Sequence, residues 1–352
     1  MMMQTEKRID WIDYAKAIGI FLVVVGHTYA GNALTNWIYS FHMPLFFFLS
    51  GTMLRNRGGY WQYIVKRFKR MLIPYLLYSI IYLVYNFLSV VVLHKDYNLI
   101  KNMIGIFLQL RWSEYSLGLW FLPLLFLSEI IVAAVIRLQL SLQFLIIIIL
   151  TASGFAYAQY VNTPLPWGAD AALIVSLFIW LGYISRPLIF NLDVDETHLV
   201  LGKVRILCRR MDIYGWIGTV AILVLFLLNI FCNKVNMLLL SDCVDMHALR
   251  YGNPLLYILA AFSGIGFTLA ACHWLLGNKR LGIMSFIGKN TLHIYCLHQL
   301  ILAFMKKINE SLVIEEYIGI VLTDLLMAMM TLALCCCIIV IVKHCKLKTA
   351  RD

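Results

Sequence analysis

The sequence predicts an all-α, polytopic integral membrane protein. Of its 352 residues, 62% are hydrophobic and only 13% are charged, a composition typical of membrane proteins. About ten apolar stretches have the length that a helix needs to cross a bilayer. We therefore expect the whole chain, 1–352, to form a single transmembrane domain with no separate soluble domain. The predicted spans are 12–31, 37–54, 71–93, 118–137, 143–160, 168–185, 213–232, 254–276, 282–304 and 315–342.

The basic residues divide unevenly between the two sides of these spans. With a cytoplasmic N-terminus, the inner segments hold most of the 29 lysines and arginines. Cytoplasmic segments carry the excess of Lys and Arg, so we expect both termini in the cytoplasm. The net charge of +11 then reflects topology and contact with anionic membrane lipids, not binding to nucleic acid. The outer segments hold Lys95, Lys101, Arg111, Lys234, Arg250, Lys306 and Lys307.

The first span, 12–31, carries Asp13, Lys16 and His27 among apolar residues. Asp13 precedes Lys16 by one turn, which predicts a local ion pair. The spacing from Lys16 to His27 is about three turns, so the two side chains share one face and lie about 16 Å apart along the axis. A central Lys or Asp costs about 2.5–3.5 kcal/mol on insertion scales. This polar stripe therefore indicates an interior face that water reaches.

The second span, 37–54, holds His42 and Pro44. A proline inside a helix removes a backbone donor and clashes with the preceding turn. We expect Pro44 to kink one continuous helix about two turns after its start. His42 has two interpretations, as a histidine that is hydrogen-bonded for structure or as a residue of a functional site.

The segment 55–70 is the densest basic cluster of the chain. Arg67 and Arg70 stand three residues apart, on one side of a helix that leads into the third span. A pair of guanidinium groups at the mouth of a membrane protein suits an anionic phosphate. The same residues also satisfy the positive-inside rule, so the residues alone leave both interpretations open.

Later spans contain further polar candidates. Glu129 lies near the middle of the fourth span, where a carboxylate is either a functional residue or the partner of a neighbouring Tyr or Lys. In the ninth span, Tyr295 and His298 share one helix face, close enough to form a hydrogen bond. The polar segment 186–212 is expected to be a cytoplasmic loop. The nine cysteines show no metal-binding spacing, so we predict neither a metal site nor a catalytic thiol.

Several stretches together resemble the integral-membrane acyltransferase-3 superfamily. The first span has a basic residue, ten intervening residues and a histidine, within RIDWIDYAKAIGIFLVVVGH, and FHMPLFFFLSG follows. These two stretches are most similar to the branch of fucose 4-O-acetylase-related sugar O-acetyltransferases. One departure is Lys16, a point charge where many members carry the forked guanidinium of Arg. Three further matches keep the order of the family: RFKRMLIPY at 67–75, LWFLPLLF at 119–126 and FIGKNTLHIYCLHQ at 286–299.

The resemblance implies an O-acetyltransferase of the cell membrane, most similar to bacterial inner-membrane enzymes. It would move an acetyl group from cytoplasmic acetyl-CoA to a hydroxyl of a polymeric or lipid-linked saccharide. It implies His27 as general base or acyl carrier, with Lys16 and Asp13 as further catalytic residues. The implied donor site comprises Arg67, Arg70, Lys16 and Trp120. The implied acceptor site comprises His42, Glu129, Tyr295 and His298.

Two other classes of protein are compatible with the residues. A proton-coupled transporter or flippase of small molecules or glycans would use the buried His, Glu and Asp groups. Such a transporter is expected to have two related halves, and the sequence shows no internal repeat. A non-catalytic membrane partner in polysaccharide assembly would bind acetyl-CoA without turnover.

Overall fold

The computed structural model describes nine segments of the chain. Within them every regular element is a helix, and an isolated β-bridge joins Asp245 to Arg250. The all-α prediction is confirmed. The polar segment expected at 186–212 lies mostly outside the described residues. Those residues are 9–28, 33–55, 58–93, 98–111, 118–190, 215–240, 243–277, 279–312 and 319–349.

Six helices of the described residues are long and apolar enough to cross a membrane. They coincide with the third, fifth, sixth, seventh, eighth and tenth predicted spans. The other predicted spans are shorter or interrupted helices. The full count of about ten and the cytoplasmic position of both termini therefore stay predictions. The six are Tyr60–Leu88, Leu140–Tyr160, Pro166–Ile189, Trp216–Met237, Pro254–Leu276 and Ile320–Cys345.

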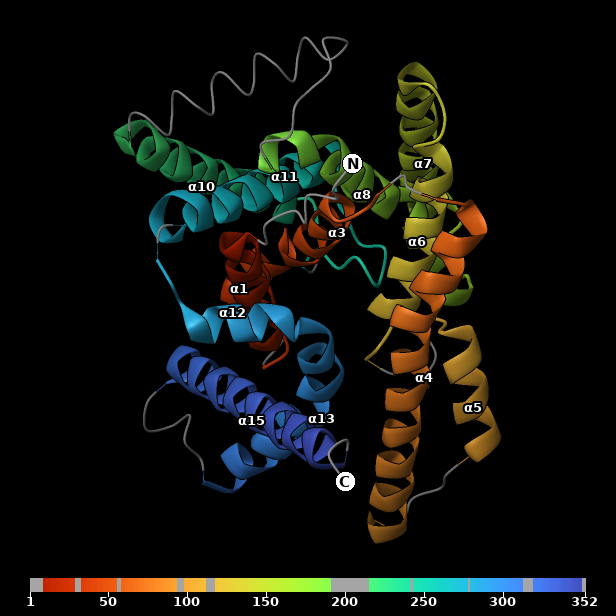
Figure 1. The fold of residues 1–352 in the computed structure, drawn as a ribbon, viewed down its shortest axis with the longest axis vertical. Helices are drawn as coiled ribbons and strands as arrows, with labels where there is room; N and C mark the ends of the chain where they lie inside the picture. Colours follow the sequence, from red (N-terminus) through yellow and green to blue (C-terminus); the bar gives the residue numbers. More distant parts are fainter. Residues whose placement is uncertain are drawn as a thin grey trace.

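Helix α1 (Asp10–Gly26) lies in the middle of the molecule (Figure 1). It packs against α3 (His42–Thr52) on one side and against the C-terminal helices on the other. The C-terminal group consists of α12 (Gly282–Lys289), α13 (Thr291–Leu312) and α15 (Ile320–Thr349). Because α1 is surrounded in this way, its polar residues face protein rather than lipid.

The long helix α4 (Tyr60–Leu93) stands along one side of the molecule, next to α5 (Leu99–Leu108) and α6 (Phe121–Val135) (Figure 1). Helix α6 packs against both α4 and α8 (Ala169–Ile189). Helix α7 (Leu140–Tyr160) packs against α8 as well. Together α6 and α8 connect α4 to the central helix α3.

A third group covers the opposite side of α3. Helix α10 (Gly215–Met237) packs along α11 (Pro254–Ala270), and α11 contacts α3. A π-helical segment, η2 (Ala271–Leu276), continues α11 and contacts α1. A short 3₁₀ turn, η1 (Pro166–Gly168), precedes α8.

The second predicted span is two helices, so the expected kink inside one continuous helix is wrong. Helix α2 (Ala33–Tyr39) ends before Ser40, and α3 begins at His42. Pro44 thus stands in the first turn of α3, where it needs no backbone donor. Its ring would clash with the carbonyl of Ser40 in a continuous helix. The Ser40 hydroxyl instead donates to the carbonyl of Trp37 at 2.7 Å.

The ninth predicted span is also interrupted, at Asn290 between α12 and α13. The Asn290 amide donates to the carbonyl oxygen of Phe286 at 2.6 Å and accepts from Lys343 Nζ at 2.7 Å. Asparagine side chains compete with the backbone for hydrogen bonds in this way and favour helix ends. The break lets α12 and α13 follow different directions around α1.

Helices α3 and α8 touch backbone to backbone through two glycines. A Cβ on Gly51 would overlap the carbonyl of Ile179, and a Cβ on Gly182 would overlap the carbonyl of Phe48. Contacts of this kind between small residues allow membrane helices to approach closely. The position of α3, and of the residues it presents to its other neighbours, depends on this contact.

We expect Gly182→Ala to lower stability, because the added methyl group forces α3 and α8 apart. Overpacking of a tight contact costs about 1–3 kcal/mol, so the thermal midpoint of unfolding in detergent should fall. Gly282→Ala is the matched control, since a Cβ there meets nothing within 4 Å. Equal midpoints for the two variants would contradict this account of the contact.

Candidate functional site

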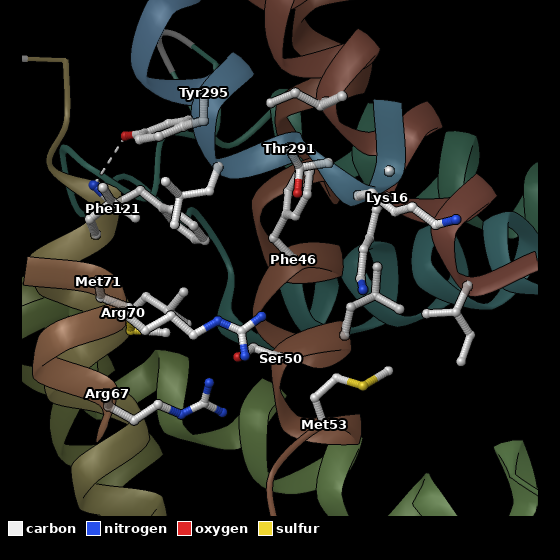
Figure 2. A pocket seen from close by; sticks show the side chains of 18 of the residues that line it. Lys16, Phe46, Ser50, Met53, Arg67, Arg70, Met71, Phe121, Thr291 and Tyr295 are labelled. Carbon is white, nitrogen blue, oxygen red and sulfur yellow. Dashed lines mark hydrogen bonds between the residues drawn. The ribbon is translucent and has the colours of Figure 1, made fainter. Parts of the chain in front are cut away.

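A cavity of about 1080 Å³ lies between α4 on one side and α1, α3 and α13 on the other (Figure 2). This volume is near the upper end of the range for small-molecule and cofactor sites. Along α1 the lining runs from Ile9 to Val23, and along α13 it includes Thr291 and Tyr295. The cavity therefore follows one face of α1 over most of its length.

The lining of the cavity is strongly basic. Arg55, Lys66 and Arg70 are exposed and mark its mouth. Among the described lining residues Asp13 is the acidic side chain, and its Oδ1 lies 3.6 Å from Lys16 Nζ. This ion pair one helical turn apart was predicted and is confirmed. The basic lining residues are Lys16, Arg55, Lys66, Arg67, Arg70 and Lys289.

A buried ion pair holds Arg67 in the wall of the cavity. Its Nε lies 2.6 Å from Glu129 Oε2, and Glu129 is fully buried. The hydroxyl of Tyr63 accepts from Arg67 Nε at 3.0 Å and donates to Glu129 Oε2 at 2.9 Å, while the Ser50 hydroxyl donates to Glu129 Oε1. Residues from α4, α6 and α3 thus meet in one hydrogen-bonded group. Glu129 is therefore the partner of Arg67 and does not line the cavity.

The charge of Arg70 is not neutralised in this way. Its guanidinium reaches into the cavity from the same wall as Arg67, opposite Lys16 (Figure 2). Among the residues that the structure describes, no carboxylate forms an ion pair with Arg70, Lys66 or Lys289. Uncompensated cations around a concave surface attract anions. The side chains of the cavity mouth have the chemistry that suits a polyanion such as a group of phosphates.

Aromatic residues form the opposite end of the cavity. The Tyr295 hydroxyl donates to the carbonyl oxygen of Gly118 at 2.8 Å and accepts from the backbone N–H of Phe121 at 3.2 Å (Figure 2). The rings of Phe121 and Tyr295 are 5.4 Å apart. These contacts fix Tyr295 at the junction of α6 and α13. The expected hydrogen bond to His298 also exists, but it uses the Tyr295 carbonyl and not the hydroxyl.

Two histidines meet just past this end. His27 follows the lining residue Val23 by one turn of α1, and His298 follows Tyr295 by one turn of α13. The imidazole rings of His27 and His298 are stacked, with centroids 5.3 Å apart and an interplanar angle of 25°. The structure therefore brings together two predicted site residues that lie far apart in the sequence.

His42 and Tyr39 lie beside this pair. The ring of Tyr39 is 6.4 Å from that of His27 and 5.0 Å from that of His42. His42 Nδ1 is 2.8 Å from the carbonyl oxygen of Ile38. His42 is thus hydrogen-bonded to the backbone of Ile38, and its ring packs on Tyr39, which also contacts His27.

Trp120 lies apart from the arginines with which it was grouped. Its ring is 4.8 Å from that of His247, in a small second cavity that Arg111 and Asp170 also line. Arg111 and Asp170 form a buried ion pair there. Burial lowers the pKa of His247 below its ordinary value, so the imidazole is neutral at pH 7. The neighbour of Trp120 in sequence, Phe121, lines the large cavity instead.

A known protein family matches most of the chain. The acyltransferase-3 family model, described as an acyltransferase domain, matches residues 9–342. The chain belongs to the acyltransferase-3 family. No curated protein and no solved structure matches it significantly. Membership of the acyltransferase-3 family, together with the apolar helices, indicates a membrane-embedded acyltransferase.

Three residues of the candidate site were not predicted as site residues from the sequence. Tyr63 and Ser50 complete the group around Glu129, and Lys289 adds a cation to the cavity. Tyr63 precedes Arg67 by four residues on one helix face, a spacing from which contact was predictable. Lys289 and Ser50 reach the site through tertiary packing, which no local pattern signals.

We expect Glu129→Leu to destabilise the protein by about 3–5 kcal/mol, because it leaves the buried charge of Arg67 without a partner. The double variant Arg67→Met/Glu129→Leu removes both charges and should recover much of that loss. Thermal unfolding in detergent measures both effects. A double variant as unstable as Glu129→Leu alone would show that packing, and not the unpaired charge, causes the loss.

Proposed function

We propose that this acyltransferase is an O-acetyltransferase that moves an acetyl group from acetyl-CoA to a hydroxyl of a saccharide. The single observation that carries the proposal is the basic cavity along α1, which ends one helical turn before His27. We further propose that the charged mouth faces the cytoplasm, in the cell membrane, and that the acceptor is a polymeric or lipid-linked saccharide. The resemblance to sugar O-acetyltransferases supports this choice of donor and acceptor.

The charges of the cavity support a coenzyme A ester as donor. Its phosphates suit Arg70, Lys66 and Lys289, which have no ion-pair partner among the described residues. Arg67 offers its two Nη atoms to the same space, because Glu129 and Tyr63 hold its Nε side. The apolar part of the cavity is then left for the thioester arm, which would point toward the histidines.

His27 is proposed to act at the thioester carbonyl. A neutral imidazole either takes the proton of the attacking hydroxyl or carries the acetyl group as an acyl-histidine. Lys16 lies about three turns and Asp13 about four turns before His27 in the chain, beside the proposed donor arm. In either route the C–S bond of the thioester breaks, an ester forms on the acceptor, and coenzyme A leaves as the thiol.

We expect His27→Ala to reduce acetyl transfer by about 10²–10⁴-fold, the usual contribution of a general acid–base residue. The measurement uses protein in proteoliposomes with acetyl-labelled acetyl-CoA and a panel of glycan acceptors. His293→Ala is the matched control, because His293 is an exposed histidine that contacts Tyr78 on another face of α13.

Transfer at the wild-type rate in His27→Ala would remove His27 from the reaction. If the wild-type protein neither bound nor consumed acetyl-CoA, the acetyltransferase proposal itself would be wrong. Glycan or proton movement across the proteoliposome membrane would then favour a transporter.

We expect Arg70→Gln to raise the KM for acetyl-CoA by roughly tenfold, since a hydrogen bond to a charged group contributes about 1.5–3 kcal/mol. The kcat should change little, because Arg70 is remote from the thioester. Lys69→Gln is the control, since Lys69 is exposed and outside the cavity lining. An equal change of KM in both variants would indicate a general charge effect instead of a phosphate site.

A further inference from the structure

His298 is a buried histidine whose protonation pattern the fold determines. Its side chain is 0% exposed, and its Nδ1 lies 2.6 Å from the carbonyl oxygen of Tyr295. A carbonyl oxygen only accepts hydrogen bonds, so Nδ1 carries the proton. In the neutral ring Nε2 is then an unprotonated acceptor.

This acceptor atom has no partner among the described residues. Within the segments that the structure describes, no donor forms a hydrogen bond with Nε2 of His298, although the atom is buried. Most buried polar atoms have a partner, and an exception calls for an explanation such as a ligand. A hydroxyl group would satisfy Nε2, since it can donate one hydrogen bond.

The stacking on His27 does not occupy this atom. Hydrogen bonds of imidazole nitrogens lie in the plane of the ring, and the His27 and His298 rings face each other at 25° and 5.3 Å. Two adjacent buried imidazoles also disfavour protonation of both at once. His298 therefore presents a neutral, oriented proton acceptor directly beside the residue at which we place the acyl group.

Two other histidines, His42 and His293, do not combine these features of His298. His42 has the same Nδ1 contact, to the carbonyl of Ile38, but its ring packs on Tyr39 and not on His27. His293, on the same helix as His298, is exposed and has its Nδ1 3.0 Å from the Tyr78 hydroxyl. Among these, His298 combines a fixed tautomer, an unpartnered Nε2 and contact with His27.

We propose that His298 is the general base for the acceptor hydroxyl, an inference that rests on the proposed acetyl transfer at His27. Coenzyme A leaves as the thiol when the acetyl group moves from the thioester sulfur to the His27 imidazole. Nε2 of His298 then takes the hydroxyl proton while the hydroxyl oxygen forms a bond to the acetyl carbonyl carbon. The C–N bond to His27 breaks, and the proton passes from His298 to the His27 imidazole that is released. His298 is thus a catalytic residue that contacts the acceptor, and Tyr295 positions it through its carbonyl group.

The test compares His298→Asn with wild type in proteoliposomes, using acetyl-labelled acetyl-CoA and a panel of methyl glycosides. An Asn amide can replace the Nδ1 donor and keep the bond to Tyr295, but it lacks Nε2. We expect transfer to fall by about 10²–10⁴-fold with the affinity for acetyl-CoA unchanged. His298→Gln, which keeps a polar atom near the Nε2 position but cannot take a proton, is the second variant if Asn lowers the thermal midpoint. His293→Asn is the control.

The outcomes separate this inference from the proposed function. If His298→Asn transfers acetyl at the wild-type rate while wild type is active, His298 is not the base and the proposed function stands. If the variants lose acetyl-CoA binding together with transfer, His298 belongs to the donor site and the inference is overturned. If wild-type protein consumes no acetyl-CoA with any acceptor, the proposed function fails and the inference fails with it.

Discussion

The buried ion pair between Arg67 and Glu129 determines how α4 meets α6 and α3. It joins α4, the outlying helix, to α6, and the hydroxyl of Ser50 brings in α3 at the same point. Two buried charges are tolerated inside a membrane protein only when each has a partner and their remaining hydrogen bonds are satisfied. Here Tyr63 and Ser50 supply those bonds. The wall of the cavity, and the direction in which Arg67 faces it, follow from this one group.

The cavity changes in character along its length. Its mouth is lined by cations, its middle by apolar side chains, and its far end leads to the stacked imidazoles of His27 and His298. Helix α1 lines the cavity from Lys16 to Val23 and carries His27 beyond it, while α13 lines it with Leu292 and Tyr295 and carries His298 beyond it. A donor with an anionic head and a reactive tail matches this order.

The sequence predicted the features that depend on local spacing. The helical class and the Asp13–Lys16 pair follow from composition and helix periodicity. Spacing also places Arg67 and Arg70 on one side of a helix, but the residues alone left open whether that side lines a site. The break before His42 was not predicted. A kink at Pro44 was expected instead, since a proline can stand inside a kinked helix or in the first turn of a new one. The stacking of His27 on His298 was not predictable from spacing, because it depends on how α12 and α13 turn at Asn290. Trp120 was grouped with the arginines by resemblance, and packing places it elsewhere.

The length of α4 has a consequence for the hydration of a bound donor. From Met71 to Leu93 the helix carries no charged residue, and at 1.5 Å per residue this part is about 35 Å long. That matches the hydrocarbon thickness of a bilayer, about 30 Å. Arg67 and Arg70 directly precede this uncharged stretch. In the proposed donor site, a polyanion held at these arginines would keep much of its water shell, and only its uncharged arm would enter the low-dielectric interior.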